Sequence, residues 1–385
     1  MKQKLPNLLR RGKGLLLAFA AATMAISHAQ AQDKVKVNNF YYYLNAENKT
    51  AELAPTEETT AYATGRLVIP GSINYEGETY SVDVIGDYAF SFCDGITSVS
   101  IPSSVKRIGN GAFQGCKKIN TVSFMMSTVE EIGDAAFEGC ETIGSITLPT
   151  TLKKLGDWAF AGCTGLRTGN IPAGVEHLGK NVYMRCTGMS VAAIRCQLTE
   201  MPDGMFDHCT SLTKITMADS IKNNIRRIGV GTFYDCPKLT TFAFGDSVAK
   251  IDACGFMGCT GLGKVTLPES VKHIGHDAFS ACQKMSEINI PANVDSIGDH
   301  AFKDAHALKQ ITMSDSVKYL GEQAFAYCQN LTSAKISKNI TEIRFKTFAG
   351  CTKLTDFTLS PNITIIADSA FQGVKCFDTL KLSNL

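Results

Sequence analysis

Apolar and polar positions along the chain repeat with a period of about 23 residues, a length typical of stacked repeat units. The interval from Ile85 to Ile108 is the first, and eleven of the twelve intervals agree with one another to within one residue. The sixth unit is longer because of an insertion around Lys222. Position 6 of every unit is aromatic, and it is Phe in all units except the fifth, which has Tyr183. The thirteen units begin at Ile85, Ile108, Ile132, Leu155, Leu178, Met201, Ile228, Ile251, Ile274, Ile297, Leu320, Ile343 and Ile366.

Each unit combines two hydrophobic periods, in the consensus I-G-x-x-A-F-x-x-C-x-x-L-x-x-I-x-I-P-x-S-V-x-x. Polar and apolar residues alternate from position 14 onward, as in residues 264–268 (KVTLP), which predicts a short strand with one face inward. Positions 6, 9 and 12 are apolar, and this spacing of three predicts one or two tight helical turns. Asp or Glu at position 3 of seven units would supply an acceptor that caps the start of the helical turn.

One such unit cannot bury its own apolar side, but stacked copies close a continuous core. A period of this length therefore indicates a solenoid. We predict a solenoid of thirteen units over residues 85–385, with short parallel β-strands on the concave face and a helical turn in each unit. In these strands, positions 15 and 17 should point inward, and positions 14 and 16 should point outward.

The two ends of the repeat array differ. Residues 32–84 are predicted to form a small N-terminal β cap or degenerate repeat, because RLVIPGSI echoes the later SVSIPSSV and TYSVDVI reads as a strand. At the other end, the sequence LKLSNL leaves Leu380 and Leu382 facing a missing neighbour. Two explanations stay open: self-association through this uncapped end, or a chain truncated relative to longer relatives.

The unit IGxxAFxxCxxLxxIxIPxSV resembles the BspA-type bacterial leucine-rich repeat, over residues 85–382. The resemblance implies a leucine-rich-repeat fold in an exported surface protein of gut or oral anaerobes, with a role in adhesion, for instance to extracellular matrix proteins. The fifth unit departs most from the pattern, because it has Tyr183 at position 6 and Ala192 and Ala193 in its strand. We expect looser packing there.

Eleven of the fourteen cysteines stand at position 9. Disulfides and metal binding compete with a third interpretation, in which these cysteines are small buried apolar residues. Position 9 is Ala305 in the tenth unit and Val374 in the thirteenth, and neither can bridge or ligate, so we favour packing. An occasional bridge, for example between Cys254 and Cys259, stays open. The predicted core includes Phe90, Cys93, Phe113, Cys116, Phe137, Cys140, Phe160, Cys163, Phe256, Cys259, Phe279, Cys282, Phe325 and Cys328.

Residues 1–31 read as a signal peptide, with five basic residues, an apolar run over residues 15–26 and a small-residue cleavage site at Ala29-Gln30-Ala31. Its removal changes the formal net charge from +2 to −3, because the leader has five positive charges and no negative ones. Nucleic acid is excluded as a main partner, because it needs clustered Lys and Arg. No later apolar run is long enough to span a membrane. We therefore expect a bacterial protein that is secreted, periplasmic or on the cell surface.

Candidate chemistry is sparse. His273, His276, His300 and His306 come nearest to a ligand cluster, but they stand at positions that other units fill with Lys, Ser, Asp or Ala, so we interpret them as solvated turn residues. No nucleophile, base and orienting acid stand in a catalytic pattern, so we predict no enzyme, no cofactor and no metal site.

The outward strand positions remain as a candidate binding face. They comprise Lys214, Thr216, Lys264, Thr266, Glu287, Asn289, Gln310, Thr312, Lys335 and Asp356. The leading hypothesis is a non-catalytic protein that binds host or neighbouring-cell macromolecules, with a protein or glycan as ligand. The alternative is a structural or glycan-capturing component of the cell envelope. Positions 14 and 16 hold no aromatic residue on which a sugar could stack, which argues mildly against glycan capture.

Overall fold

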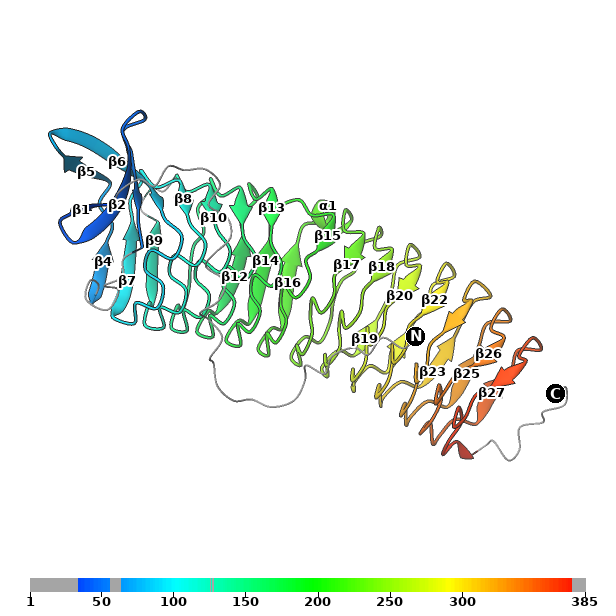
Figure 1. Ribbon diagram of the computed structural model, residues 1–385. Helices are drawn as coiled ribbons and strands as arrows, with labels where there is room; N and C mark the ends of the chain where they lie inside the picture. The colour runs from blue at the N-terminus through cyan, green and yellow to red at the C-terminus, as the bar shows by residue number, and fades with distance from the viewer. Residues whose placement is uncertain (1–33, 56–63, 125, 127, 376–385) are drawn as a thin grey trace, which may run out of the picture. The chain divides into compact units, whose positions relative to one another are not determined.

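Two ladders of short parallel strands hold the repeat units together, and Figure 1 shows the turns stacked in chain order. The computed structural model describes residues 34–55, 64–124, 126 and 128–375. Twelve complete turns lie between the opening residues of the first and last units, Ile85 and Ile366. The predicted leucine-rich-repeat solenoid is confirmed by the register of its strands, which sets equivalent positions of successive units opposite each other. The predicted signal peptide, Cys376, Leu380 and Leu382 lie outside the described residues.

In the first ladder, here called the opening ladder, each strand consists of the last residue of one unit and the first residue of the next. Its register places identical positions opposite each other, for example Ile108 opposite Ile132. It was not predicted, because two-residue strands carry no alternating pattern of their own. Its strands are the end of β6 (Glu78–Ile85), β8 (Arg107–Ile108), β10 (Glu131–Ile132), β11 (Lys154–Leu155), β13 (His177–Leu178), β15 (Glu200–Met201), β17 (Arg227–Ile228), β18 (Lys250–Ile251), β20 (His273–Ile274), β22 (Ser296–Ile297), β24 (Tyr319–Leu320), β26 (Glu342–Ile343) and β28 (Ile365–Ile366).

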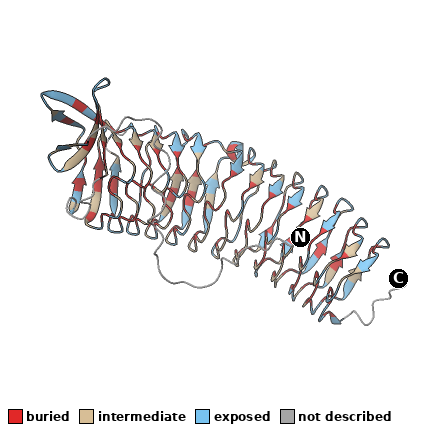
Figure 2. Cartoon of the chain, viewed as in Figure 1, coloured by how far each residue is buried: buried red, intermediate tan, exposed pale blue. Residues whose placement is uncertain are grey.

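The second ladder contains the strands that the alternating pattern predicts. Buried and more exposed residues alternate along most of them (Figure 2), except in β7, where Ser100 at an outward position is buried. In β19, for example, Lys264 is exposed and Val265 is buried, which confirms the inward and outward assignment. Its strands are β4 (Gly65–Val68), β7 (Ile96–Ile101), β9 (Thr121–Phe124), β12 (Thr168–Ile171), β14 (Val191–Ile194), β16 (Lys214–Met217), β19 (Lys264–Val265), β21 (Glu287–Ile288), β23 (Gln310–Thr312), β25 (Ser333–Lys335) and β27 (Asp356–Thr358).

The predicted helical turn is wrong, because positions 3 to 12 form consecutive tight turns. In the first unit, Tyr88 and Phe92 at positions 4 and 8 have left-handed φ angles of 58° and 59°. The N–H groups of positions 4, 6 and 8 bond to the next unit, as the Phe90 N–H donates to the Ala112 carbonyl oxygen at 2.8 Å. A helix would keep these bonds within its own segment. Within the described residues, the only α-helix is α1 (Asp219–Lys222), which forms in the long sixth unit.

The carboxylate at position 3 also serves the neighbouring turn. Asp87 Oδ1 accepts the Asn110 N–H at 2.9 Å, and Asp157 Oδ1 accepts the Lys180 N–H at 2.7 Å. The predicted acceptor is therefore real, but its donor lies one unit further on. Position 2 is Gly in nine of the thirteen units, and the turns approach closely there: a Cβ on Gly109 would lie 2.6 Å from the backbone nitrogen of Asp87.

The aromatic residues at position 6 form one column through the core. Their rings stack nearly parallel, with centroids 5.3 Å apart between Phe256 and Phe279. At the fifth unit the spacing widens to 6.0 Å on both sides of Tyr183, in line with the looser packing expected there. The predicted core residues of positions 6 and 9 are all buried.

The position-9 cysteines are buried thiols, as the packing interpretation predicts. None of the thirteen cysteines that the structure describes is in a disulfide, and Cys254 is the one that is not fully buried. The thiols have a role that the sequence did not reveal, because ten of the eleven at position 9, those that follow the first unit, donate to the position-6 carbonyl of the preceding unit. Cys282 Sγ, for example, lies 3.2 Å from the Phe256 carbonyl oxygen.

The N-terminal segment caps the array as predicted. Strands β1 (Val35–Val37), β2 (Phe40–Asn45) and β3 (Thr50–Leu53) are antiparallel, while β3 pairs in parallel with β6. Strand β5 (Ser72–Tyr75) forms a hairpin with β6, and β4 pairs with β7, as a degenerate repeat should. The ring of Phe40 meets that of Phe90 edge-on at 6.1 Å and so covers the first member of the aromatic column.

Truncating one ring of the column should destabilise the protein far more than changing an outward strand residue. The Phe256→Ala variant should lose about 3–5 kcal/mol of unfolding free energy, because it leaves a cavity between stacked rings. The Thr266→Ala variant, at an exposed position of the second ladder, should change it by less than about 0.5 kcal/mol. Denaturant unfolding measures both, and equal losses would contradict the inward and outward assignment.

Alkaline pH should destabilise the fold through the buried thiols. Burial raises the pKa of Cys163 and Cys259 from the ordinary 9.0 to about 12. The unfolded chain therefore binds fewer protons than the folded one between pH 9 and 12, so stability is full below about pH 9 and falls above it. Each thiol contributes a slope of up to about 1.4 kcal/mol per pH unit.

The control is the double variant Cys163→Ala/Cys259→Ala, which copies the alanine found naturally at position 305. Its unfolding free energy should fall less steeply with pH above pH 9 than that of the unmodified protein. Identical slopes in denaturant titrations from pH 7 to 11 would show that these thiols do not ionise on unfolding.

Candidate binding surface

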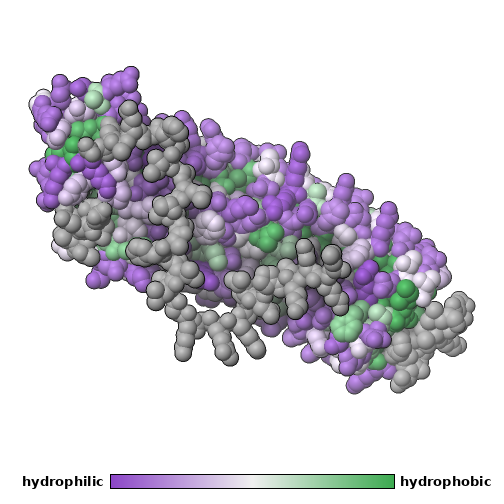
Figure 3. All heavy atoms as spheres, in the orientation of Figure 1, coloured by the Kyte–Doolittle hydropathy of each residue, from purple (hydrophilic) through white to green (hydrophobic). Residues whose placement is uncertain are grey.

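The outward side chains of the second ladder form a polar surface, here called the strand face. It contains the ten residues predicted as a binding face, and all ten are exposed. Their inward neighbours Val265, Ile288 and Ile311 are buried in the core. Because inward and outward residues alternate along these strands, the ten predicted residues lie outside the packed core. Figure 3 shows hydrophilic side chains over most of the visible face, with hydrophobic groups in small separate patches.

Polar side chains on the strand face interact from one turn to the next, in one ion pair and one hydrogen bond. Lys264 Nζ lies 2.9 Å from Glu287 Oε1, and Ser333 Oγ lies 2.8 Å from Asp356 Oδ2. These pairs follow from the register, which places Lys264 opposite Glu287. Exposed pairs of this kind add little stability, so both partners can turn to a ligand at small cost. The surface thus has both signs of charge.

Asn289 differs from the other predicted residues. Its side-chain oxygen accepts the Leu267 N–H at 2.7 Å, and its side-chain nitrogen donates to the Leu267 carbonyl at 2.9 Å. The amide therefore extends the two-residue pairing of β19 and β21 by one rung. Although Asn289 is exposed, its side chain forms hydrogen bonds within the second ladder.

The strand face is interrupted by a hollow where the second ladder breaks. Residues 240–244 of the seventh unit form no strand. In their place, Phe242 and Phe244 occupy the inward positions that are usually aliphatic, and both rings contact Phe256, at 5.3 and 5.5 Å. These rings are larger than the usual aliphatic residues, but residues 144–149 of the third unit, with aliphatic Ile146 and Leu148, also form no strand, so ring size alone does not account for the loss of strand pairing.

The hollow has a volume of about 380 Å³ and includes two of the predicted binding residues, Lys214 and Thr216. Sequence reasoning missed Lys222, which lies in α1 and pairs with Asp219 at 2.9 Å. The signals were the insertion and the sequence TFAFG, but neither shows that a cavity results. Its lining consists of Thr213, Lys214, Ile215, Thr216, Met217, Lys222, Thr241, Phe242 and Ala243.

A second, wider groove of about 840 Å³ lies along the opening ladder of units three to six. Three of its charged residues, Lys180, Glu200 and Asp203, are engaged in ion pairs, two of them with Arg227. Arg227 Nη1 lies 2.9 Å from Glu200, Arg227 Nη2 lies 2.6 Å from Asp203, and Lys180 Nζ lies 3.0 Å from Asp203. This network ties the long sixth unit to its neighbours, so we assign the groove a structural role.

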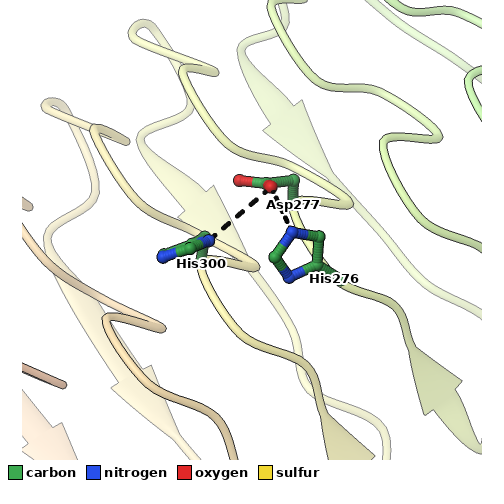
Figure 4. Close-up of side chains that lie close together, drawn as sticks. All are labelled: His276, Asp277 and His300. Carbon is green, nitrogen blue, oxygen red and sulfur yellow. Dashed lines mark ion pairs between the residues drawn. The ribbon is translucent and has the colours of Figure 1, made fainter. Parts of the chain in front are cut away.

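Two of the four histidines considered as ligands lie together. His276 and His300 are on adjacent turns, with the Asp277 carboxylate between them (Figure 4). His273 instead contacts Asp295 at 2.8 Å, and His306 contacts Asp304 at 3.5 Å. The sequence did not single out Asp277, because its proximity to His300 depends on how the two turns stack.

Within the part of the chain that the structure describes, no helix has both the length and the apolar character needed to cross a bilayer.

Comparison with known proteins identifies the repeat. The model of the BspA type leucine rich repeat region matches residues 120–225, 226–355 and 272–384. No curated protein matches the chain.

Solved structures agree with this assignment. A leucine-rich repeat protein from Bacteroides ovatus is 25% identical, with a TM-score of 0.67 over 89% of this chain and 93% of that one. A leucine rich cell surface protein from Faecalibacterium prausnitzii is 24% identical, with a TM-score of 0.52 over 90% and 88% of the two chains. The pneumococcal vaccine antigen PcpA is 18% identical, with a TM-score of 0.55 over 89% and 95%. The chain therefore belongs to the BspA-type leucine-rich repeat family, as its repeat unit predicts.

Proposed function

We propose that the protein is exported from a bacterial cell and binds a protein of a host or a neighbouring cell along its strand face, without catalysis. The observation that carries this proposal is the exposure of all ten predicted strand-face residues. From β16 to β27 this surface spans seven turns, or about 29 Å at the usual strand spacing. Such a long, shallow surface suits a macromolecule, because small molecules prefer enclosed pockets.

The chemistry of the strand face favours a protein ligand. Paired charges of both signs, such as Lys264 and Glu287, can pair with the mixed charges of a protein surface. The hollow beside β16 adds an apolar floor of Ile215, Met217 and Phe242 beneath Lys214. A protein side chain with an apolar stem and an acidic end would suit this hollow.

A non-catalytic role is supported by the state of the thiols. Burial raises the pKa of Cys116, Cys163, Cys259 and Cys351 to about 12, so these thiols stay protonated at neutral pH. A thiol needs to ionise to act as a nucleophile. The cysteines that recur at position 9 are thus used for packing.

Location outside the cytoplasm rests on the predicted leader and on the family. The Faecalibacterium prausnitzii structure is described as that of a cell surface protein. A position on the surface or in the surrounding medium would expose the strand face to other cells. Secretion, periplasmic location and surface attachment are separated by fractionating the producing bacterium.

Glycan capture is the alternative, and it would use a different surface. Tyr88, Phe92, Trp158 and Tyr327 are exposed aromatics at positions 4 and 8 of their units, away from the strand face. Sugars stack on exposed rings of this kind. A glycan-binding protein should therefore lose binding when Trp158 and Tyr327 are changed to Ala, and keep it when the strand face is changed.

The test measures binding of the protein to a panel of extracellular matrix proteins and to a glycan array. The quadruple variant Lys264→Ala/Glu287→Ala/Gln310→Ala/Lys335→Ala should lose at least about tenfold in affinity for a protein ligand, or about 1.4 kcal/mol. Its thermal stability should stay close to that of the unmodified protein, because the four side chains are exposed.

The matched control changes the same residue types at exposed positions outside the strand face: Lys284→Ala/Glu322→Ala/Gln283→Ala/Lys318→Ala. This variant should bind as the unmodified protein does. Equal affinity of both variants would refute the strand face as the binding surface. Binding to glycans alone, abolished by Trp158→Ala and Tyr327→Ala, would support the alternative.

A further inference from the structure

We propose that His276, Asp277 and His300 bind one divalent transition-metal ion, with Zn²⁺ as the best-suited ion. Among the described residues, they are the one group of three or more His, Cys, Asp or Glu side chains whose ligand atoms all lie within 4.8 Å of one another. The group lies on the turn segments of the ninth and tenth units, apart from the strand face.

The distances suit a small ion between the three side chains. Asp277 Oδ2 lies 2.7 Å from His276 Nε2 and 3.6 Å from His300 Nδ1 (Figure 4). Ligand atoms about 2.0–2.1 Å from a tetrahedral Zn²⁺ lie about 3.4 Å from one another. The two observed distances bracket this value, so small rotations of the side chains bring all three atoms into the coordination sphere.

The stacking of the turns fixes the backbone beneath each ligand. The Asp277 N–H donates to the Asp299 carbonyl at 2.9 Å, and the His300 N–H donates to the Glu322 carbonyl at 2.8 Å. Asp277 and His300 both occupy position 4, where their φ angles are 53° and 58°. Equivalent positions on adjacent turns are therefore held at the strand spacing. A site held in this way loses little freedom when an ion binds.

The three side chains differ in their exposure to solvent, and this difference suits metal binding. The Asp277 side chain is only 16% exposed, whereas His276 is 49% and His300 is 26% exposed. The carboxylate thus lies between two imidazoles, while the outer side stays open to solvent. Three protein ligands with an open fourth position can accept water or a group from a bound partner.

The chemistry of the three ligands selects the class of ion. Imidazole nitrogen suits Zn²⁺, Cu²⁺, Ni²⁺ and Fe²⁺, whereas Mg²⁺ and Ca²⁺ prefer oxygen ligands alone. Histidine and aspartate also meet elsewhere in the protein, as at His306 and Asp304, 3.5 Å apart. That pair has a single imidazole and supplies an internal control.

The experiment is a calorimetric titration of the protein, prepared without an affinity tag, with Zn²⁺ and separately with Mg²⁺. The unmodified protein should bind one Zn²⁺ per chain and show no saturable binding of Mg²⁺. Its thermal midpoint should rise with Zn²⁺ concentration, because an ion that binds only the folded state stabilises it.

Two variants test the ligands without disturbing the fold. His300→Gln and Asp277→Asn place at position 4 the residues that other units already have there, Gln323 and Asn181. Each should weaken Zn²⁺ binding at least tenfold and reduce the thermal shift, whereas His306→Ala should bind within twofold of the unmodified protein. Absence of a 1:1 site, unchanged affinity in His300→Gln, or an equal loss in His306→Ala would overturn the proposal.

Discussion

The hydrogen bonding between successive turns is the constraint on which the rest of the structure depends. No unit satisfies its own backbone, because the N–H groups at positions 4, 6 and 8 bond to carbonyl groups one turn further on, as Phe90 does to Ala112. Buried backbone groups must be paired, so a turn is complete only beside its neighbour. Identical positions are thereby brought into line. The stacked rings, the thiols that donate to carbonyls and the glycines at position 2 all follow from this register.

The same register arranges the proposed binding surfaces. Because equivalent residues of successive units lie one above another, residues that are far apart in the sequence form a single row on the surface. Exposed positions 14 and 16 become the strand face, and position 4 brings Asp277 beside His300. Units that depart from the consensus sequence differ locally in structure. In the seventh unit, where Phe242 and Phe244 stand at the inward positions and no strand forms, a hollow lined by Lys214 and Phe242 lies beside the second ladder. A single scaffold thus provides both an extended surface and separate local sites.

The sequence pattern predicted the length of the unit, the N-terminal cap, the burial of the thiols and the inward and outward strand positions, because each of these depends on a local pattern. It did not predict the conformation between the strands. An apolar spacing of three is shared by helices and by turns with left-handed residues such as Tyr88. The difference lies in hydrogen bonds to another unit, which no local pattern reveals. The sequence pointed to His276 and His300 but not to Asp277, for the same reason: Asp277 becomes a neighbour of His300 only through the stacking of two turns.

Native-state hydrogen exchange tests the stacking most directly, at the backbone amides of Cys254, Phe256 and Gly258. These three N–H groups bond to His276, Ala278 and Ser280 on the following turn. The account predicts that all three exchange as slowly as the buried strand amides of the same unit, although they lie in a segment without helix or strand. Exchange as fast as in an exposed loop would contradict it, because the turns would then not be joined through their backbones.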